Sequence, residues 1–163
     1  MAKVEPKWLN PKEMRAWRSY IIASRRLLEA LDQDLSGHDL SMADYEVLAQ
    51  LSEAPGRRIR MSDLAEIAML SKSRLSHRIT VMERAGWVKR EACKEDRRGA
   101  WAVMTEKGLK AIVKAAPDHV GSVRARFLDR LDGEDQVNLA QVFEEVLTGL
   151  RSEFKSEAAD DKS

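Results

Sequence analysis

The first part of the chain carries apolar side chains at the spacing of a long helix. Between residues 11 and 36 they recur at every third or fourth position and so share one helical face. This face holds Trp17, Tyr20, Ile21, Ser24, Leu27, Leu28, Leu31 and Leu35. Pro11 after Asn10 suits the first turn of such a helix, and Gly37 follows as a stop signal. The pattern therefore predicts one helix over residues 11–36.

Three shorter helices are predicted next, each introduced by a serine suited to cap it. The capping residues are Ser41, Ser62 and Ser71, and the third helix turns Leu75, Ile79 and Met82 inward. Gly86 ends that helix. Strand-like runs then cover residues 87–93 and 100–104, with a charged hairpin over 94–99 between them. Three helices followed by a β-hairpin is the element order of a winged helix-turn-helix.

The last third of the chain returns to helical spacing. Thr105 is suited to cap a helix whose apolar period continues to Leu131, and Pro117 inside it predicts a kink. Asp132 with Asp135 begins a final helix that is apolar along one face as far as Phe154. These outer helices carry more apolar surface than one small lobe can bury, which predicts a homodimer. The alternative is a monomer in which the terminal helices pack together.

The predicted fold is therefore mainly α-helical with a small β-hairpin wing. A winged helix-turn-helix lobe spans residues 41–104. A helical dimerisation lobe consists of 11–36 and 105–155, and residues 156–163 form a polar tail.

The distribution of charge changes what the total charge implies. The 163 residues include 28 Lys or Arg and 27 Asp or Glu, and the resulting net charge of +1 argues against a nucleic-acid binder. Residues 57–107, however, hold 13 basic and 7 acidic side chains, whereas the rest of the chain holds 15 and 20. The excess of positive charge thus falls on the predicted winged helix-turn-helix lobe, which favours double-stranded DNA as the partner.

The helix that begins after Ser71 is the predicted reader of that DNA. Its N-terminal end enters the major groove in helix-turn-helix proteins. We expect Ser73, Arg74 and His77 to reach base edges, and Lys72 and Arg78 to bind phosphates. For His77 the alternative is an ordinary exposed residue. The predicted contact residues of this helix are Ser71, Lys72, Ser73, Arg74, His77 and Arg78.

The charged hairpin supplies a second predicted contact. Arg97 and Arg98 at its tip are suited to a flanking minor groove, where narrow A·T tracts attract guanidinium groups. Asp96 is predicted to pair with a nearby arginine and to hold the shape of the tip.

Other kinds of site find no support in the sequence. Cys93 is the only cysteine, and no CxxC, HExxH, GxGxxG, GxxxxGK[ST] or GxSxG motif is present. We therefore predict no enzyme activity, no metal site and no cofactor. The N-terminus lacks the apolar segment of a secretory signal, and no stretch is long and apolar enough to cross a membrane. The expected location is the cytoplasm.

The hairpin and its surroundings resemble the MarR family of bacterial transcriptional regulators. The family's wing motif is an Asp, an Arg two residues on, and an apolar strand that ends in Leu-Thr with a Gly three residues later. Asp96, Arg98, Thr105 and Gly108 match it, and Met104 takes the place of the usual Leu. Upstream, residues 71–90 resemble the recognition helix and first wing strand of the family.

The resemblance implies a homodimeric regulator, usually a repressor, that binds a palindromic operator and releases it when a small aromatic ligand acts near the dimer helices. Trp17, Tyr20, Met42 and Tyr45 are candidates to line such a pocket, and ordinary interface packing is the alternative. Cys93 lies on a wing strand and has no counterpart among the redox-sensing cysteines of the family. A winged-helix adaptor that binds a protein partner rather than specific DNA is the alternative function.

Overall fold

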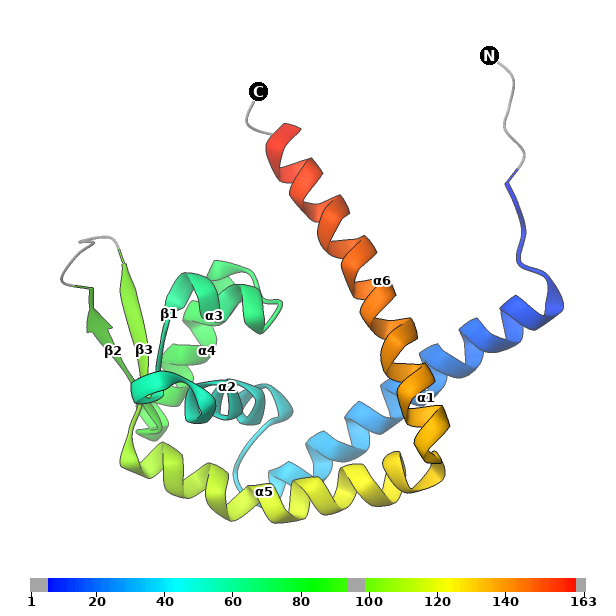
Figure 1. Ribbon diagram of the computed structural model, residues 1–163. Coiled ribbons are helices and arrows are strands. Elements are labelled where there is room, and N and C mark those ends of the chain that lie inside the picture. Colours follow the sequence, from blue (N-terminus) through cyan, green and yellow to red (C-terminus); the bar gives the residue numbers. More distant parts are fainter. Residues whose placement is uncertain (1–5, 94–98, 161–163) are drawn as a thin grey trace. The chain divides into compact units, whose positions relative to one another are not determined.

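The computed structural model describes residues 6–93 and 99–160, and the side chains of these residues as far as residue 150. One compact unit ends at Ser122 and a second begins at Val123. The elements in chain order are α1 (Pro11–Ser36), α2 (Met42–Glu53), η1 (Pro55–Arg57), β1 (Arg58–Arg60), α3 (Met61–Ile67), α4 (Lys72–Ala85), β2 (Val88–Ala92), β3 (Ala100–Met104), α5 (Glu106–Arg126), η2 (Leu128–Arg130) and α6 (Gly133–Asp160) (Figure 1). The predicted fold class, mainly helical with a small β wing, is confirmed.

Most of the predicted helix starts are confirmed by their capping bonds. The Asn10 side chain accepts the backbone N–H groups of Lys12 and Glu13 at the start of α1. Ser41 and Asp44 form a reciprocal capping box at α2, in which each side chain accepts the backbone N–H of the other residue. Such boxes satisfy two of the N–H groups that a helix start leaves unpaired. These bonds explain why α1 and α2 begin where the polar residues stand.

Three details of the predicted elements are wrong. Ser62 does not cap α3, because the helix begins at Met61 with Arg60 as its N-cap residue, and the Ser62 hydroxyl donates to Asp63 instead. The helix predicted to continue to Leu131 ends at Arg126; Pro117 lies inside it, and the kink predicted there stays a prediction. The last helix continues through Asp160, beyond residue 155, where the polar tail is predicted to start.

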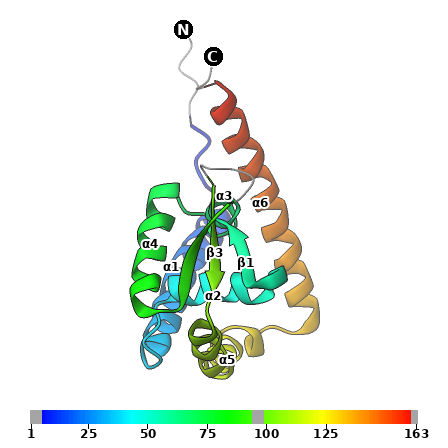
Figure 2. The same cartoon turned by 90° about the vertical axis from the view of Figure 1, so that its left-hand side faces the viewer.

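The sheet has three antiparallel strands in the order β1-β3-β2, one more than the predicted hairpin. Figure 2 shows β1 beside β3, with which it pairs. Strand β1 pairs Arg58 with Val103 and Arg60 with Trp101. Its three residues are too few for the alternation of apolar and polar positions to stand out in the sequence. The extra strand ties the turn after α2 to the wing.

The core of the first unit lies where α2, α4 and the sheet meet. Its largest fully buried side chains include Leu48, Leu51, Leu75, Ile79 and Met82. From α1, Leu31 and Leu35 are the buried residues. One arc of α4 is buried through Leu75, Ile79 and Met82, so the opposite arc of the helix faces solvent.

The junction of strand β3 and helix α5 explains the Thr-Glu-Lys-Gly sequence found there. The Thr105 hydroxyl donates to the Gly86 carbonyl at 2.7 Å and accepts the Gly108 N–H at 3.0 Å. Its backbone N–H donates to the carbonyl of Trp87 at 2.9 Å. A Cβ added to Gly108 would lie 2.2 Å from that same carbonyl oxygen. Thr105 and Gly108 together hold α5 directly against the turn between α4 and β2.

Within the part of the chain that the structure describes, no helix is long and apolar enough to cross a membrane. Nor do the described side chains contain a group of three or more His, Cys, Asp or Glu placed to hold a metal ion.

Candidate nucleic-acid interface

Helix α4 presents a polar arc at its N-terminal end. The Ser71 side chain caps the helix by accepting the Arg74 N–H at 3.3 Å, and Gly86 ends it in the left-handed conformation at φ 78°. Because the inward arc is completely buried, Ser73 and His77 face outward and are exposed. This is the arrangement that the helical spacing predicts.

Four of the six predicted contact residues gather around one open groove. Ser73, Arg74, His77 and Arg78 line it together with Ala43 and Leu70, and its volume is about 350 Å³. The two arginines and the imidazole therefore share a surface with a small apolar floor. A base edge needs both hydrogen-bonding groups and apolar contact, so the groove offers the chemistry of base recognition.

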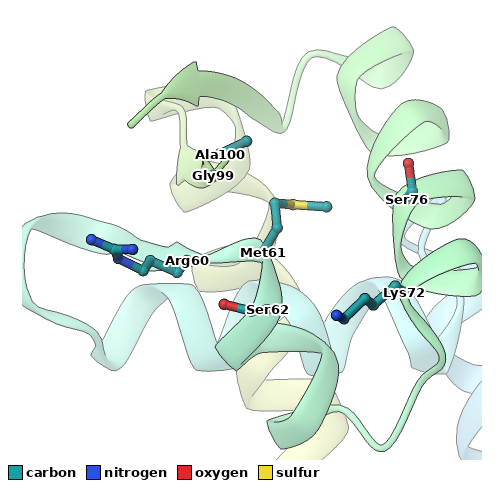
Figure 3. A pocket seen from close by; sticks show the side chains of 7 residues that line it. All are labelled: Arg60, Met61, Ser62, Lys72, Ser76, Gly99 and Ala100. Atoms are coloured by element: carbon teal, nitrogen blue, oxygen red, sulfur yellow. The ribbon is translucent and has the colours of Figure 1, made fainter. Parts of the chain in front are cut away.

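Lys72 lies on a separate groove of about 320 Å³, between α4 and the junction of β1 with α3 (Figure 3). In Figure 3 its side chain extends toward Ser62, and the Ser76 hydroxyl lies on the same helix further along. Arg60 also lines this groove. The structure thus places Lys72 on a different groove from Arg74, and its predicted phosphate contact stays a prediction.

Arg78 is engaged inside the fold. Its Nη1 lies 3.3 Å from Asp44 Oδ1 and 3.3 Å from the Ser41 hydroxyl. The Asp44 side chain is only 8% exposed and that of Arg78 is 34% exposed. A buried carboxylate requires such a partner. Arg78 therefore joins α4 to the start of α2, a role that the sequence reasoning missed, and its predicted phosphate contact stays a prediction.

Arg90 of β2 also bonds within the fold. The helical wheel places Thr80 on the exposed side of α4, but its hydroxyl accepts a bond from Arg90 Nη2 at 3.1 Å. The sequence treats Arg90 only as part of the excess of basic charge. Two other basic residues are likewise paired, Arg57 with Glu106 and Lys89 with Glu91. The acidic partners of these pairs are already included in the count over residues 57–107, so the excess of positive charge on the lobe remains.

The outer face of the sheet carries a cluster that sequence reasoning missed. The guanidinium carbons of Arg58 and Arg60 lie 4.1 and 5.3 Å from the centroid of the Trp101 ring. The Lys89 ammonium, 2.8 Å from Glu91, lowers the pKa of that carboxyl, and Arg58 acts in the same direction. The run Arg58-Ile59-Arg60 is too short to have signalled this strand, or the cluster on it, in the sequence.

The predicted wing contacts Asp96, Arg97 and Arg98 lie outside the described residues. The hairpin strands that lead to them are described, and the Cys93 N–H donates to the Gly99 carbonyl at 3.0 Å where the two strands approach residues 94–98. The side chain of Cys93 is buried. The minor-groove contact stays a prediction.

The residues predicted to line a ligand pocket are not brought together within the described chain. Met42 lies beside Asp32 of α1, whose Oδ1 accepts its N–H at 2.7 Å. Trp17 is fifteen residues earlier on α1, about 22 Å away at 1.5 Å per residue. The rings of Trp17 and Tyr20 lie 6.2 Å apart on a largely exposed stretch. The pocket therefore stays a prediction.

Tyr45, the fourth predicted pocket residue, packs on α5 instead. Its ring centroid lies 4.2 Å from that of His119, which is only 9% exposed. Burial lowers the pKa of His119 below its ordinary value of 6.5, although Asp34 opposes the shift. The fold thus favours the neutral form of His119.

The free energy of unfolding should therefore depend on pH through His119. Unfolding restores the ordinary pKa of 6.5, so the unfolded chain binds the extra proton first. The contribution of His119 to the free energy of unfolding is fully present above pH 6.5. It is lost as the pH falls below 6.5 and through the lower pKa that His119 has in the folded protein. Urea unfolding at pH 7.5 and 5.5 should show a smaller pH dependence for His119→Gln than for the unmodified protein. An equal dependence in both would mean that His119 does not titrate on unfolding.

The geometry defines a winged helix-turn-helix lobe, and comparison with known proteins assigns its family. A model of the MarR family matches residues 38–99. The transcriptional regulator HosA of Escherichia coli is 33% identical over 110 residues, which are 67% of this chain and 78% of HosA. The chain belongs to the MarR family of transcriptional regulators. The family members that it matches are regulators and not enzymes.

Two solved structures from Streptomyces coelicolor are similar over nearly the whole chain. AbsC, a MarR family transcriptional regulator, is 48% identical with a TM-score of 0.88, covering 90% of this chain and 99% of AbsC. Sco3205, a family member solved in complex with DNA, is 41% identical with a TM-score of 0.87, covering 90% of this chain and 92% of that chain. The family assignment thus extends beyond the matched residues 38–99.

Proposed function

We propose that this protein is a homodimeric, sequence-specific DNA-binding repressor that acts in the cytoplasm on a palindromic operator. The observation that carries the proposal is the groove at the start of α4. It gathers Ser73, Arg74 and His77 on the exposed arc of a helix whose opposite arc is buried. The DNA complex of Sco3205, at 41% identity, supports double-stranded DNA as the partner.

Exposed apolar side chains on the outer helices support the dimer. On α1 these are Trp17, Ile22 and Leu28, and on α6 they are Val137, Val142, Val146, Leu147 and Leu150. Monomeric proteins rarely leave so many large apolar side chains in water along whole helices. A second copy of the chain would cover them and give an operator with two-fold symmetry.

Release by a small aromatic ligand is the remaining part of the proposal. It rests on the resemblance to the family and on aromatic side chains of α1 and α2. A screen of aromatic acids against the bound complex would identify such a ligand.

Selection of bound duplexes from a random pool tests the proposal directly. A dimer that reads two half-sites should enrich inverted repeats in which the centres of the two half-sites are about 10 base pairs apart. Enrichment of a single unrepeated half-site would contradict the dimer. No enrichment at all would favour the alternative adaptor, which binds a protein through the same lobe.

Arg74→Ala should weaken binding to the selected operator by about 1–3 kcal/mol and relax the preference at one position of each half-site. The physical reason is that Arg74 is exposed on the groove beside Ser73 and His77, within reach of a base edge. Fluorescence anisotropy with operators altered at single positions measures both effects. An equal loss on every sequence would show instead that Arg74 binds a phosphate.

A further inference from the structure

Arg90 of β2 makes an unusually complete set of bonds to the predicted recognition helix. Its Nη2 donates to the Ser76 carbonyl at 2.7 Å, to the Ser76 hydroxyl at 3.3 Å and to the Thr80 hydroxyl at 3.1 Å. Its Nη1 pairs with Glu83 Oε2, and its backbone N–H donates to Glu83 Oε1 at 2.8 Å. One residue of the sheet thus holds three residues of α4.

The three partners follow a regular spacing. Ser76, Thr80 and Glu83 are four and three residues apart, so they lie along one stripe that covers two turns of α4. A guanidinium that bonds all of them resists rotation of the helix about its own axis as well as movement away from the sheet. The planar, forked donor group of arginine is suited to this task, and the single ammonium of lysine is not.

The neighbouring stripe of α4 contains side chains that would meet the DNA. At 3.6 residues per turn, Ser73 and His77 lie roughly 75° around the helix from the stripe that Arg90 holds. For a helix about 10–12 Å across, a rotation of about 20° moves its outer side chains by roughly 2 Å. Hydrogen bonds to base edges tolerate only about 0.5 Å. The rotation of α4 about its own axis therefore decides whether these side chains can form hydrogen bonds with base edges.

We infer that Arg90 is a positioning residue for operator recognition, which sets the rotation of α4 and thereby its base preference without touching DNA itself. The inference rests on the proposed function, because it requires that α4 reads a DNA sequence. The Arg90 side chain is 29% exposed and that of its partner Glu83 is 30% exposed, so both are largely covered by the fold. Non-specific attraction to phosphates depends on exposed charge and should not need Arg90.

The test compares two duplexes, the selected operator and a scrambled sequence of the same composition. Arg90→Lys keeps the positive charge but cannot bond the whole stripe. We expect it to weaken operator binding about tenfold or more, the value of one lost base contact, while binding to the scrambled duplex changes less than about twofold. Repeating the selection with the variant should return a less specific sequence.

Lys89→Arg is the matched control. Lys89 is the preceding residue of the same strand and pairs with Glu91 on the outer face of the sheet. This variant should leave both affinities unchanged. Thermal unfolding confirms that each variant is folded at the assay temperature. If Arg90→Lys is not folded, Thr80→Val removes one acceptor of the guanidinium and should shift the operator preference in the same direction.

The outcomes separate the inference from the proposed function. An unchanged operator preference in the folded variants overturns the inference alone. Equal losses on both duplexes also overturn it, because they would make Arg90 a general contact or a residue that acts only through stability. A wild-type protein that does not distinguish operator from scrambled duplex overturns the proposed function, and the inference falls with it.

Discussion

Gly108→Ala should lower the free energy of unfolding by at least about 1–3 kcal/mol, the typical cost of forced overpacking. The added Cβ would lie 2.2 Å from the carbonyl oxygen of Trp87, and this neighbour is backbone that cannot turn away. Helix α5 would have to move from the turn between α4 and β2, breaking the bonds of Thr105 to Gly86 and Trp87. Urea unfolding followed by tryptophan fluorescence measures the loss.

Gly121→Ala in the same helix is the control for this prediction. Nothing lies within 4 Å of a Cβ added there, and alanine is the better helix former by about 1 kcal/mol. The control should therefore be neutral or stabilising. A similar loss in both variants would mean that the loss in Gly108→Ala does not come from the contact with Trp87.

Raising the salt concentration should reduce operator affinity by a very large factor. A dimer that neutralises about 6–10 phosphates loses roughly 10³–10⁵ in affinity between about 50 and 200 mM salt, because counterions are released on binding. Among the described residues, the exposed cations Lys72 and Arg74 near the start of α4 are expected to contribute.

Titrations at four salt concentrations, plotted as log affinity against log salt, provide the slope. Lys72→Gln should reduce the slope by about one for each phosphate contact that it removes, at all sequences alike. A nearly flat plot would contradict recognition of DNA by this surface and would favour the adaptor.

The sequence predicts those parts of the molecule that depend on local pattern. The spacing of Leu75, Ile79 and Met82 sets which arc of α4 is buried, and Ser71 marks its start, so the positions of Arg74 and His77 follow. These are consequences of helical period and capping, which act within a few residues. The family motif is equally local, since the bond between Thr105 and Gly108 spans three residues.

Pairings between distant residues could not be read from that pattern. Arg78 meets Asp44 across 34 positions, and Arg90 reaches Ser76 across 14. A sequence shows these arginines only as positive charge, because their partners are chosen by the packing of α2, α4 and β2. Strand β1 is not predicted from the sequence for a related reason, because its three residues become a strand only through pairing with β3.

The order of the strands has a consequence for how the protein behaves in concentrated solution. Strands β1 and β2 form the two edges of the sheet, and an unpaired edge is a template for joining another chain. One edge is only three residues long and carries Arg58 and Arg60, and the other carries Lys89, Arg90 and Glu91. Short, charged edges repel a second sheet, so the lobe should resist aggregation through its strands and leave self-association to the helices.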